Sequence, residues 1–278
     1  LVLVLINRRL TPEEMAHIVS DTTPEILFCD TDMTDQAEEL RTNGSSIKEL
    51  VVVDDADKTF ASLYDQPVLT SQAAVSDDDP FIIIHTAAVL GKPRGAVLSQ
   101  ANVILSNQQM IETYQLTPEK AYLNILPMFH IMGINLGLGT LQAGGKNVIQ
   151  EKFDPAQALE LIQEQRITIF GSFPPIVSTL LDAMEAGSYD LSSLEITTGL
   201  EAPETAEQWE SKSDATFWTL YGQTETSGLV TSAPYFDRAG SAGTTLPLAA
   251  VRIGDETDHP ADPGQIGEIL LRGPLVFQ

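Results

Sequence analysis

The residues best suited to chemistry lie in a short loop, 86–95, which combines two glycines, a proline and the cations Lys92 and Arg94. Glycine lets backbone N–H groups approach an anion, and lysine or arginine neutralises its charge. The apolar run 82–84 predicts a buried strand before the loop, and Ser99 predicts a helix start after it. A strand, a basic glycine-containing loop and a helix in this order indicate a phosphate-binding site. A tight surface turn is the alternative.

Three more loops carry chemically useful side chains where predicted strands end. They are residues 127–133 with His130, residues 198–203, and residues 222–226 with Glu225. Open α/β sheets bind ligands beyond the carboxyl ends of their strands, so we expect these loops to act together. They supply a carboxylate, hydroxyls, an aromatic ring and glycines, a set that suits a nucleoside triphosphate with a divalent metal. Taken singly, His130 also fits a packed histidine and Glu225 a helix-start acid.

Apolar runs and helix-start signals alternate along most of the chain, which favours parallel strand pairing. Thr11, Pro12 and Glu14 form a capping-box helix start, and Ser99 caps a helix that runs to about Gln115. We expect strands at 1–6, 26–29, 50–53, 82–84, 121–126, 147–150, 167–170, 194–197, 216–221, 249–253 and 268–271. Further helices are expected at 36–41 and 204–212, with one that begins at Asp154 and another that follows Pro175 and ends at about Gly187.

The predicted fold class is α/β, with layered parallel-sheet subdomains that have helices on both faces and a small all-β subdomain at the C-terminal end. Three parts follow: an α/β subdomain over 1–120 with the basic loop, a second α/β subdomain over 121–230, and an incomplete β subdomain over 231–278. The last boundary rests on the loss of helix signals near residue 231.

Composition excludes several classes of partner and site. The 15 basic and 39 acidic residues give a charge of −24, which argues against nucleic acid and anionic membranes. No apolar run approaches the roughly 20 residues of a membrane helix, and no signal peptide is evident. The single cysteine, Cys29, allows neither an internal disulfide nor a cysteine-based zinc site, so a cytoplasmic location is expected. Because the chain begins without Met, we expect it to be part of a longer polypeptide.

Four motifs together resemble the ATP-dependent adenylate-forming enzymes, which include acyl-CoA synthetases, peptide-synthetase adenylation domains and luciferases. They are Ile84–Gln100, Leu126–Gly133, Tyr221–Glu225 and Gly264–Gly273. They occur in the family's order, and the resemblance covers nearly the whole chain. The motif around His130 is most similar to that of the acyl-CoA synthetases.

The resemblance implies a two-step ligase reaction with ATP, Mg²⁺ and coenzyme A. A carboxylic acid attacks the α-phosphate of ATP to give acyl-AMP, and the thiol of coenzyme A then takes the acyl group.

The resemblance also implies which residues bind the nucleotide. The β- and γ-phosphates are assigned to Thr86, Gly91, Lys92 and Arg94. The adenine is assigned to Gly199, Leu200, Glu201 and Tyr221, with Gly222 in the same set, and the α-phosphate to Thr224. Glu225 would hold Mg²⁺. His130 would gate the acyl pocket, with Gly133, Phe173 and Thr198 as walls, so that 121–230 would carry the acyl and adenine pocket. The catalytic candidates are Thr86, Arg94, His130, Thr224 and Glu225.

Two departures from the family pattern leave alternatives open. Residues 87–90 replace most of the loop's usual hydroxyls and one glycine, and Arg94 stands where lysine is usual. Lost neutral hydrogen bonds are worth about 0.5–1.5 kcal/mol each, enough to slow turnover. The chain also ends before the family's ribose-binding aspartate and adenylating lysine, so the isolated chain is expected to adenylate poorly. The alternatives are a carrier-protein-loading adenylation domain and a non-catalytic nucleotide or acyl binder.

Overall fold

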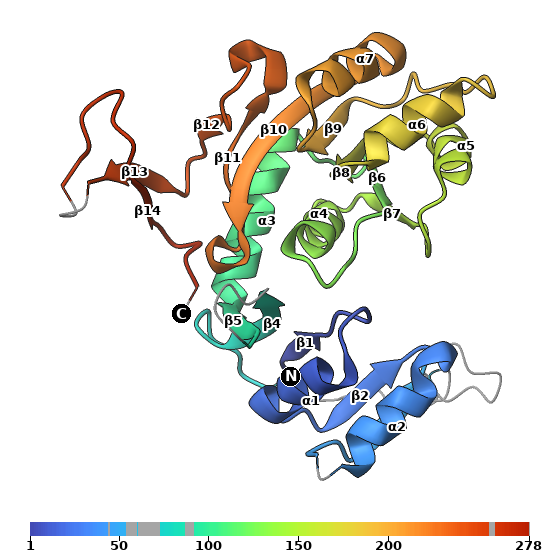
Figure 1. Ribbon diagram of the computed structural model, residues 1–278, viewed down its shortest axis with the longest axis vertical. Helices are drawn as coiled ribbons and strands as arrows, with labels where there is room; N and C mark the ends of the chain where they lie inside the picture. The colour runs from blue at the N-terminus through green and yellow to red at the C-terminus, as the bar shows by residue number, and fades with distance from the viewer. Residues whose placement is uncertain (44, 54–59, 61–72, 87–91, 256–258, 278) are drawn as a thin grey trace. The chain divides into compact units, whose positions relative to one another are not determined.

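The computed structural model of the chain describes residues 1–43, 45–53, 60, 73–86, 92–255 and 259–277. The chain divides into two compact units, Leu1–Val97 and Leu98–Gln278, whose elements are labelled in Figure 1. The three-part division at residues 120 and 230 stays a prediction. No helix among the described residues has the length and hydropathy that a membrane crossing requires.

The first unit alternates strands and helices as its sequence predicts. Strand β2 pairs in parallel with β3, and β1 pairs in parallel with β4. A small core forms where α1 and α2 bury Met15, Val19 and Leu40 against Ile47. The elements are β1 Leu3–Leu5, α1 Pro12–Thr22, β2 Ile26–Cys29, η1 Thr31–Met33, α2 Thr34–Thr42, β3 Glu49–Val52, β4 Pro80–Thr86 and β5 Arg94–Ser99.

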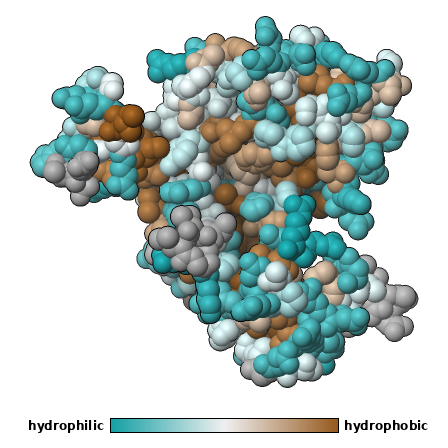
Figure 2. All heavy atoms as spheres, in the orientation of Figure 1, coloured by the Kyte–Doolittle hydropathy of each residue, from teal (hydrophilic) through white to brown (hydrophobic). Residues whose placement is uncertain are grey.

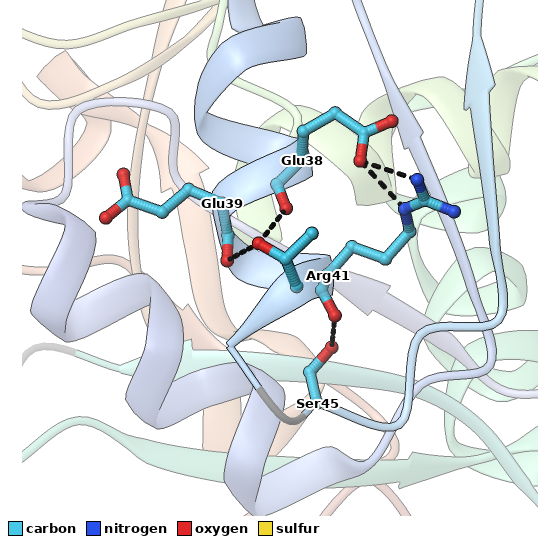
Figure 3. A network of polar contacts seen from close by, with 5 residues as sticks. Glu38, Glu39, Arg41 and Ser45 are labelled. Carbon is cyan, nitrogen blue, oxygen red and sulfur yellow. Dashed lines mark hydrogen bonds and ion pairs between the residues drawn. The ribbon is translucent and has the colours of Figure 1, made fainter.

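The helix ends of this unit are closed by local hydrogen bonds. Helix α1 begins with the predicted capping box, in which the Glu14 backbone N–H donates to Thr11 Oγ1 and the Thr11 N–H to the Glu14 carboxylate. At the end of α2, shown in Figure 3, the Ser45 hydroxyl donates to the Arg41 carbonyl oxygen (3.3 Å). The Arg41 side chain reaches back to the Glu38 carboxylate (2.8 Å). The bonds of Thr11 and Ser45 satisfy backbone groups that a helix terminus leaves unpaired, whereas the Arg41–Glu38 bond joins two side chains on the helix surface.

The predicted order of strand, basic loop and helix omitted one strand. A second strand, β5, follows the loop and lies beside β4 in a three-stranded sheet, and helix α3 then begins after its N-cap Ser99, as the sequence predicts. Burial alternates along this segment as it does in a strand, because Ala96 and Leu98 are buried while Val97 between them is half-buried. Gly95 lies so close to β4 that a Cβ there would be 2.8 Å from the Ile83 side chain.

The second unit is a seven-stranded sheet with helices on both faces (Figure 1). The strand order is β12-β11-β10-β9-β8-β6-β7. The run from β10 to β7 is parallel, and β11 and β12 are antiparallel additions at the edge. The elements are α3 Gln100–Tyr114, β6 Ala121–Asn124, α4 Ile131–Gln142, β7 Lys146–Ile149, α5 Pro155–Gln165, β8 Ile169–Ser172, α6 Ile176–Met184, β9 Ile196–Gly199, α7 Pro203–Ser213, β10 Thr216–Gln223, η3 Thr224–Thr226, β11 Gly228–Pro234, η4 Tyr235–Arg238 and β12 Thr244–Thr245.

Two apolar layers hold this sheet, one on each face. Helices α5, α6 and α7 pack on one side, where Trp209 meets Phe170 edge to face at 5.7 Å between ring centroids. Helices α3 and α4 pack on the other side through Tyr114 and Leu136. Strand β6 contributes to both layers by alternation, with Leu123 on the first side and Tyr122 on the second. The mixed α/β fold with parallel layers confirms the predicted class.

The segment after residue 231 is divided between two sheets. Strand β12 joins the large sheet, whereas β13 (Ala250–Gly254) and β14 (Glu268–Arg272) form a two-stranded antiparallel sheet. Apolar groups are exposed over this pair in Figure 2, and Ile253 and Ile269 are among the exposed residues. A separate all-β subdomain is thus not distinguished from the second unit.

Candidate functional site

A cavity of about 580 Å³ lies in the second unit where the central parallel strands end. Leu126 follows β6, Phe173 follows β8, Leu200 follows β9, and Tyr221 lies near the end of β10. The loops 127–133, 198–203 and 222–226 therefore converge as the strand-end rule predicts. The other lining residues are Pro127, His130, Ile131, Met132, Gly133, Leu220, Gly222, Thr224, Gly228, Leu229 and Ala242.

The first turn of α4 forms one wall of the cavity. Ile131, Met132 and Gly133 line it, and His130 takes the N-cap position with an extended backbone. The His130 side chain is exposed and stacks obliquely on Phe129, with 4.6 Å between ring centroids. The amino end of a helix carries partial positive charge. This wall is therefore apolar along its length and favourable to an anion at its start.

Gly133 fixes how closely α4 approaches the preceding loop. A Cβ at this position would lie 2.3 Å from the carbonyl oxygen of Pro127. Because that oxygen belongs to the backbone, it cannot swing aside as the end of a side chain can. Gly133 thus holds the loop in the position from which His130 reaches the cavity.

The loop after β9 presents Leu200 to the cavity and turns Glu201 inward. Gly199 has φ +156°, and a Cβ there would lie 1.7 Å from the Ser172 carbonyl oxygen, so the turn requires glycine. The Ser172 hydroxyl donates to the Glu201 carboxylate (2.9 Å), and so does the backbone N–H of Val177. Burial raises the pKa of Glu201, and these two hydrogen bonds oppose the rise.

Thr198 does not line the cavity. Its side chain is fully buried, and its hydroxyl shares a 2.7 Å hydrogen bond with the hydroxyl of Tyr114 on α3. The neighbouring Thr197 is also fully buried, and its hydroxyl accepts a hydrogen bond from the indole of Trp209 on α7 (2.8 Å). Both side chains thus tie β9 to helices on its two faces, which gives Thr198 a structural contact instead of the predicted wall position.

The end of β10 places its polar residues on the opposite wall. A register shift between Tyr221 and Gly222 marks a bulge against β11. Tyr221, Gly222 and Thr224 line the cavity, and Thr224 is buried. Glu225 follows in the short η3 turn and is half-buried. A Cβ on Gly222 would lie 1.9 Å from the Gly228 carbonyl oxygen, so the bulge also depends on glycine.

Glu225 is a single carboxylate and not part of a preformed metal cluster. Within the described residues no group of three or more His, Cys, Asp and Glu side chains could hold a metal ion. The backbone carbonyl of Glu225 accepts a hydrogen bond from the Phe277 N–H (2.9 Å), which fixes the turn. Mg²⁺ is often held by one or two carboxylates together with substrate phosphates. One half-buried carboxylate beside a ligand cavity fits that donor set.

The basic loop belongs to the first unit. Thr86 ends β4, and its hydroxyl lies 3.5 Å from the Arg94 carbonyl oxygen. Lys92 and Arg94 are both exposed. The imidazole Nε2 of His17 on α1 lies 3.2 Å from the Pro93 carbonyl oxygen between them. Gly91 and residues 87–90 lie outside the described residues.

The comparison with protein families identifies the chain. The model for AMP-binding enzymes matches residues 1–278. The chain belongs to the AMP-binding enzyme family. Among the curated relatives of the chain are CoA ligases. It is 31% identical to the indoleacetate–CoA ligase of Aromatoleum aromaticum over 98% of its own length and 55% of the relative. It is also 31% identical to the 2-succinylbenzoate–CoA ligase of Enterococcus faecalis over 70% of its own length and 41% of the relative. The chain spans about half the length of these relatives.

Solved structures share the fold of the chain over its full length. A Rhodopseudomonas palustris protein assigned as a long-chain-fatty-acid CoA ligase superimposes with a TM-score of 0.91 at 38% identity, covering 100% of this chain and 70% of that one. The ATP-bound MatB of the same organism superimposes with a TM-score of 0.86 at 25% identity, covering 100% of this chain and 56% of that one. The predicted resemblance to acyl-CoA synthetases is thereby confirmed.

Sequence reasoning missed the part of the cavity wall that comes from β11. Gly228 and Leu229 line the cavity because β11 turns back beside β10 after the η3 turn. The available signal was Ser227–Gly228 followed by the apolar pair Leu229–Val230, which marks a turn into a strand. Ala242 also lines the cavity and lies in the glycine-containing segment 240–243.

Proposed function

We propose that this AMP-binding enzyme activates a carboxylic acid as its acyl-adenylate and passes the acyl group to the thiol of coenzyme A. The observation that carries the proposal is the cavity of the second unit. It is lined mainly by apolar side chains and includes the amino end of α4 and the polar end of β10. An apolar acyl group with a charged head matches that division. The CoA ligases among its relatives support the same class of reaction.

The first step needs positioning more than acid or base catalysis. A carboxylate oxygen forms a bond to the α-phosphorus of ATP, and the bond from that phosphorus to the pyrophosphate oxygen breaks. Both reactants are anionic, so the enzyme must hold them in line and offset their charge. We assign the acyl group to the walls formed by Gly133 and Phe173, with His130 at the entrance. These apolar walls would also keep water from the acyl-adenylate.

The nucleotide assignments follow the residues on the opposite wall. Tyr221 would stack on the adenine, with the backbone of Gly199 and Leu200 beside it. The Thr224 hydroxyl would donate a hydrogen bond to the α-phosphate. The carboxylate of Glu201 is occupied by Ser172 and by the backbone of α6. We therefore assign Glu201 to holding the adenine loop in place.

We assign the β- and γ-phosphates to Thr86, Lys92 and Arg94, of which the exposed cations Lys92 and Arg94 would offset the phosphate charge. ATP is the bound nucleotide in the MatB structure that superimposes on the whole chain. Glu225 would hold Mg²⁺ together with phosphate oxygens. When bound, the ion would draw negative charge from the leaving pyrophosphate.

In the second step the thiolate of coenzyme A attacks the acyl carbonyl carbon, and the bond from that carbon to the AMP oxygen breaks. The carrier-protein alternative would use the same chemistry with a protein-bound thiol. The CoA ligases among the relatives favour coenzyme A. We further propose a cytoplasmic setting without a nucleic-acid partner, which the single cysteine and the charge of −24 support.

The test is acid-dependent exchange of labelled pyrophosphate into ATP, run on the whole protein that the gene encodes. The panel follows the names of the relatives reported above: indoleacetate, 2-succinylbenzoate and a long-chain fatty acid. We expect at least one acid to drive exchange. No exchange with any acid, together with no ATP binding in calorimetry, would contradict the proposal, whereas ATP binding without exchange would favour the non-catalytic nucleotide binder. Replacing coenzyme A by a carrier protein as acceptor separates the two ligase forms.

A matched pair of variants tests the nucleotide assignment. Thr224→Val removes the hydroxyl of a buried residue that lines the cavity, and we expect about 10- to 100-fold slower exchange for a lost hydrogen bond to a charged group. Thr140→Val is the control, because Thr140 is fully buried in α4 and its hydroxyl donates to the Leu136 carbonyl oxygen within the helix. Equal effects of the two substitutions would show that Thr224 has no special role.

A further inference from the structure

A buried polar network joins α3 and α4 to the segment that follows η3. Its members are Ser106 on α3, Asn135 on α4 and Ser227, which are 1%, 2% and 1% exposed. Burying polar groups is unfavourable unless they find hydrogen-bond partners. These three residues meet on the face of the sheet that α3 and α4 cover, where Asn102, Asn107 and Gln109 of α3 are also buried.

The network converges on one backbone carbonyl, that of Ser227. The Ser106 hydroxyl donates to it (2.6 Å), and the Asn135 amide also donates to it. The same amide donates to the Ser106 hydroxyl oxygen (3.1 Å). The Ser227 hydroxyl continues the network by donating to the Leu275 carbonyl oxygen (2.8 Å). One carbonyl is thus held by side chains from two different helices.

The contact between α4 and the turn is also sterically tight. Gly228 has φ +110°, and a Cβ there would lie 2.5 Å from the side-chain nitrogen of Asn135. A side chain at position 228 would push Asn135 away from the Ser227 carbonyl. The backbone of the turn therefore rests directly against the Asn135 amide.

Asn135 stands between the two halves of the proposed site. One turn before it, Ile131 and Met132 line the cavity where the acyl group is assigned. The carbonyl that Asn135 binds lies three residues after Thr224, the residue assigned to the α-phosphate. Helix α4 is continuous from Ile131 to Gln142, so a shift of its first turn also moves Asn135.

We propose that Asn135 is a positioning residue that couples acid binding to ATP binding. This inference rests on the proposed function and adds the link between its two substrates. An acid in the cavity restrains α4, and Asn135 passes that restraint to the Ser227 carbonyl and so to the η3 turn. ATP then meets a turn that is already ordered, which gives positive coupling between the two substrates.

The test compares Asn135→Leu with a control from the same pair of helices. Asn107 on α3 is 4% exposed, and its amide donates to the Gln142 side chain at the far end of α4 (3.0 Å). Asn107→Leu therefore also removes a buried amide between α3 and α4 but leaves the Ser227 carbonyl untouched. Ser106→Ala is a milder second variant that removes one donor to that carbonyl. It takes the place of Asn135→Leu in the test if that variant does not fold.

Two readouts separate positioning from simple loss of stability. The first is hydrogen exchange of the backbone amides of residues 224–228. The second is the affinity for α,β-methylene-ATP, in which the bridge between the α- and β-phosphorus cannot be cleaved. This affinity is measured with and without the panel acid that gives the fastest pyrophosphate exchange. In the parent protein we expect the acid to strengthen nucleotide binding. We expect Asn135→Leu to lower that coupling about 3- to 10-fold, as loss of one hydrogen bond predicts, and to speed amide exchange at 224–228. Ser106→Ala should act in the same direction, and Asn107→Leu should change neither value.

Unchanged coupling in Asn135→Leu and Ser106→Ala would overturn the inference, and so would an equal loss in Asn107→Leu. Failure of the proposed function itself has a different signature. In that case the parent protein shows no nucleotide affinity with or without acid, which overturns both claims at once.

Discussion

Two glycines on one helix give opposite predictions for the same substitution. Gly133 and Gly137 are both buried on α4, four residues apart. A Cβ at Gly133 would lie 2.3 Å from the Pro127 carbonyl oxygen, so Ala there forces the backbone apart by about 1 Å or more. At Gly137 the nearest atoms are side-chain atoms of Asn124 and Asn147 at 3.5 Å, an ordinary contact.

The magnitudes follow from overpacking and helix propensity. Overpacking costs about 1–3 kcal/mol, and replacing a helical glycine with alanine gains up to about 1 kcal/mol. That gain is complete at Gly137 in mid-helix and smaller at Gly133 in the first turn. We expect Gly133→Ala to lower the free energy of unfolding by about 1–2 kcal/mol and Gly137→Ala to raise it by about 0.5–1 kcal/mol.

Denaturant unfolding of both variants measures the difference directly. Gly133→Ala should also weaken acid binding, because the displaced 127–129 loop carries His130 away from the cavity entrance. Gly137→Ala should leave acid binding unchanged. If Gly133→Ala proves as stable as Gly137→Ala, the close approach of α4 to Pro127 is wrong, and with it the account of this wall.

Three further predictions concern charge. Burial lowers the pKa of His85 from 6.5, opposed by Asp21. Just below pH 6.5 the unfolded chain therefore binds more protons than the folded chain, so the free energy of unfolding decreases as the pH is lowered. His85→Gln should weaken the pH dependence of this free energy between pH 7.5 and 5 more than His259→Gln does. An equal pH dependence in the two variants would contradict the burial of His85. Because burial raises the pKa of Glu201, stability falls as pH rises above about 4.5. The stability of Glu201→Gln relative to the parent should then increase from pH 4 to pH 7 in chemical denaturation, and a constant difference would refute this. With a charge of −24, raising KCl from about 0.05 to about 1 M should raise the melting temperature by screening self-repulsion, whereas a fall would mean that attraction dominates.

The sequence predicted those elements whose signal is local. Continuous apolar runs marked β2 and β6, and the capping residues Thr11 and Ser99 marked the starts of α1 and α3. Strand β11 was missed because its local signal is short, limited to the turn Ser227–Gly228 and the apolar pair Leu229–Val230, and the polar residues that follow are stabilised by distant partners. The Thr231 hydroxyl bonds to Ala242, and the Ser232 hydroxyl bonds to Thr219. Such long-range pairing leaves no local pattern in the sequence.

The same distinction explains which of the predicted site residues line the cavity. Topology alone brings strand-end loops together, so the convergence of Leu200, Tyr221 and His130 on one cavity could be expected. Thr198 lies within β9, where both faces are covered by helices, and no sequence pattern near it reveals Tyr114 as its partner. Glu201 turns inward because Gly199 bends the chain toward Ser172. Only the folded backbone sets these two directions.

We propose that ATP reacts at its α-phosphorus with a carboxylic acid. Mass spectrometry of the whole protein incubated with ATP, Mg²⁺ and a panel acid, in the absence of coenzyme A, tests this reaction most directly. We expect acyl-AMP and pyrophosphate, formed only when acid and ATP are both present, and strongly reduced in Thr224→Val. Formation of ADP and phosphate, or of AMP without its acyl ester and independent of acid, would contradict it.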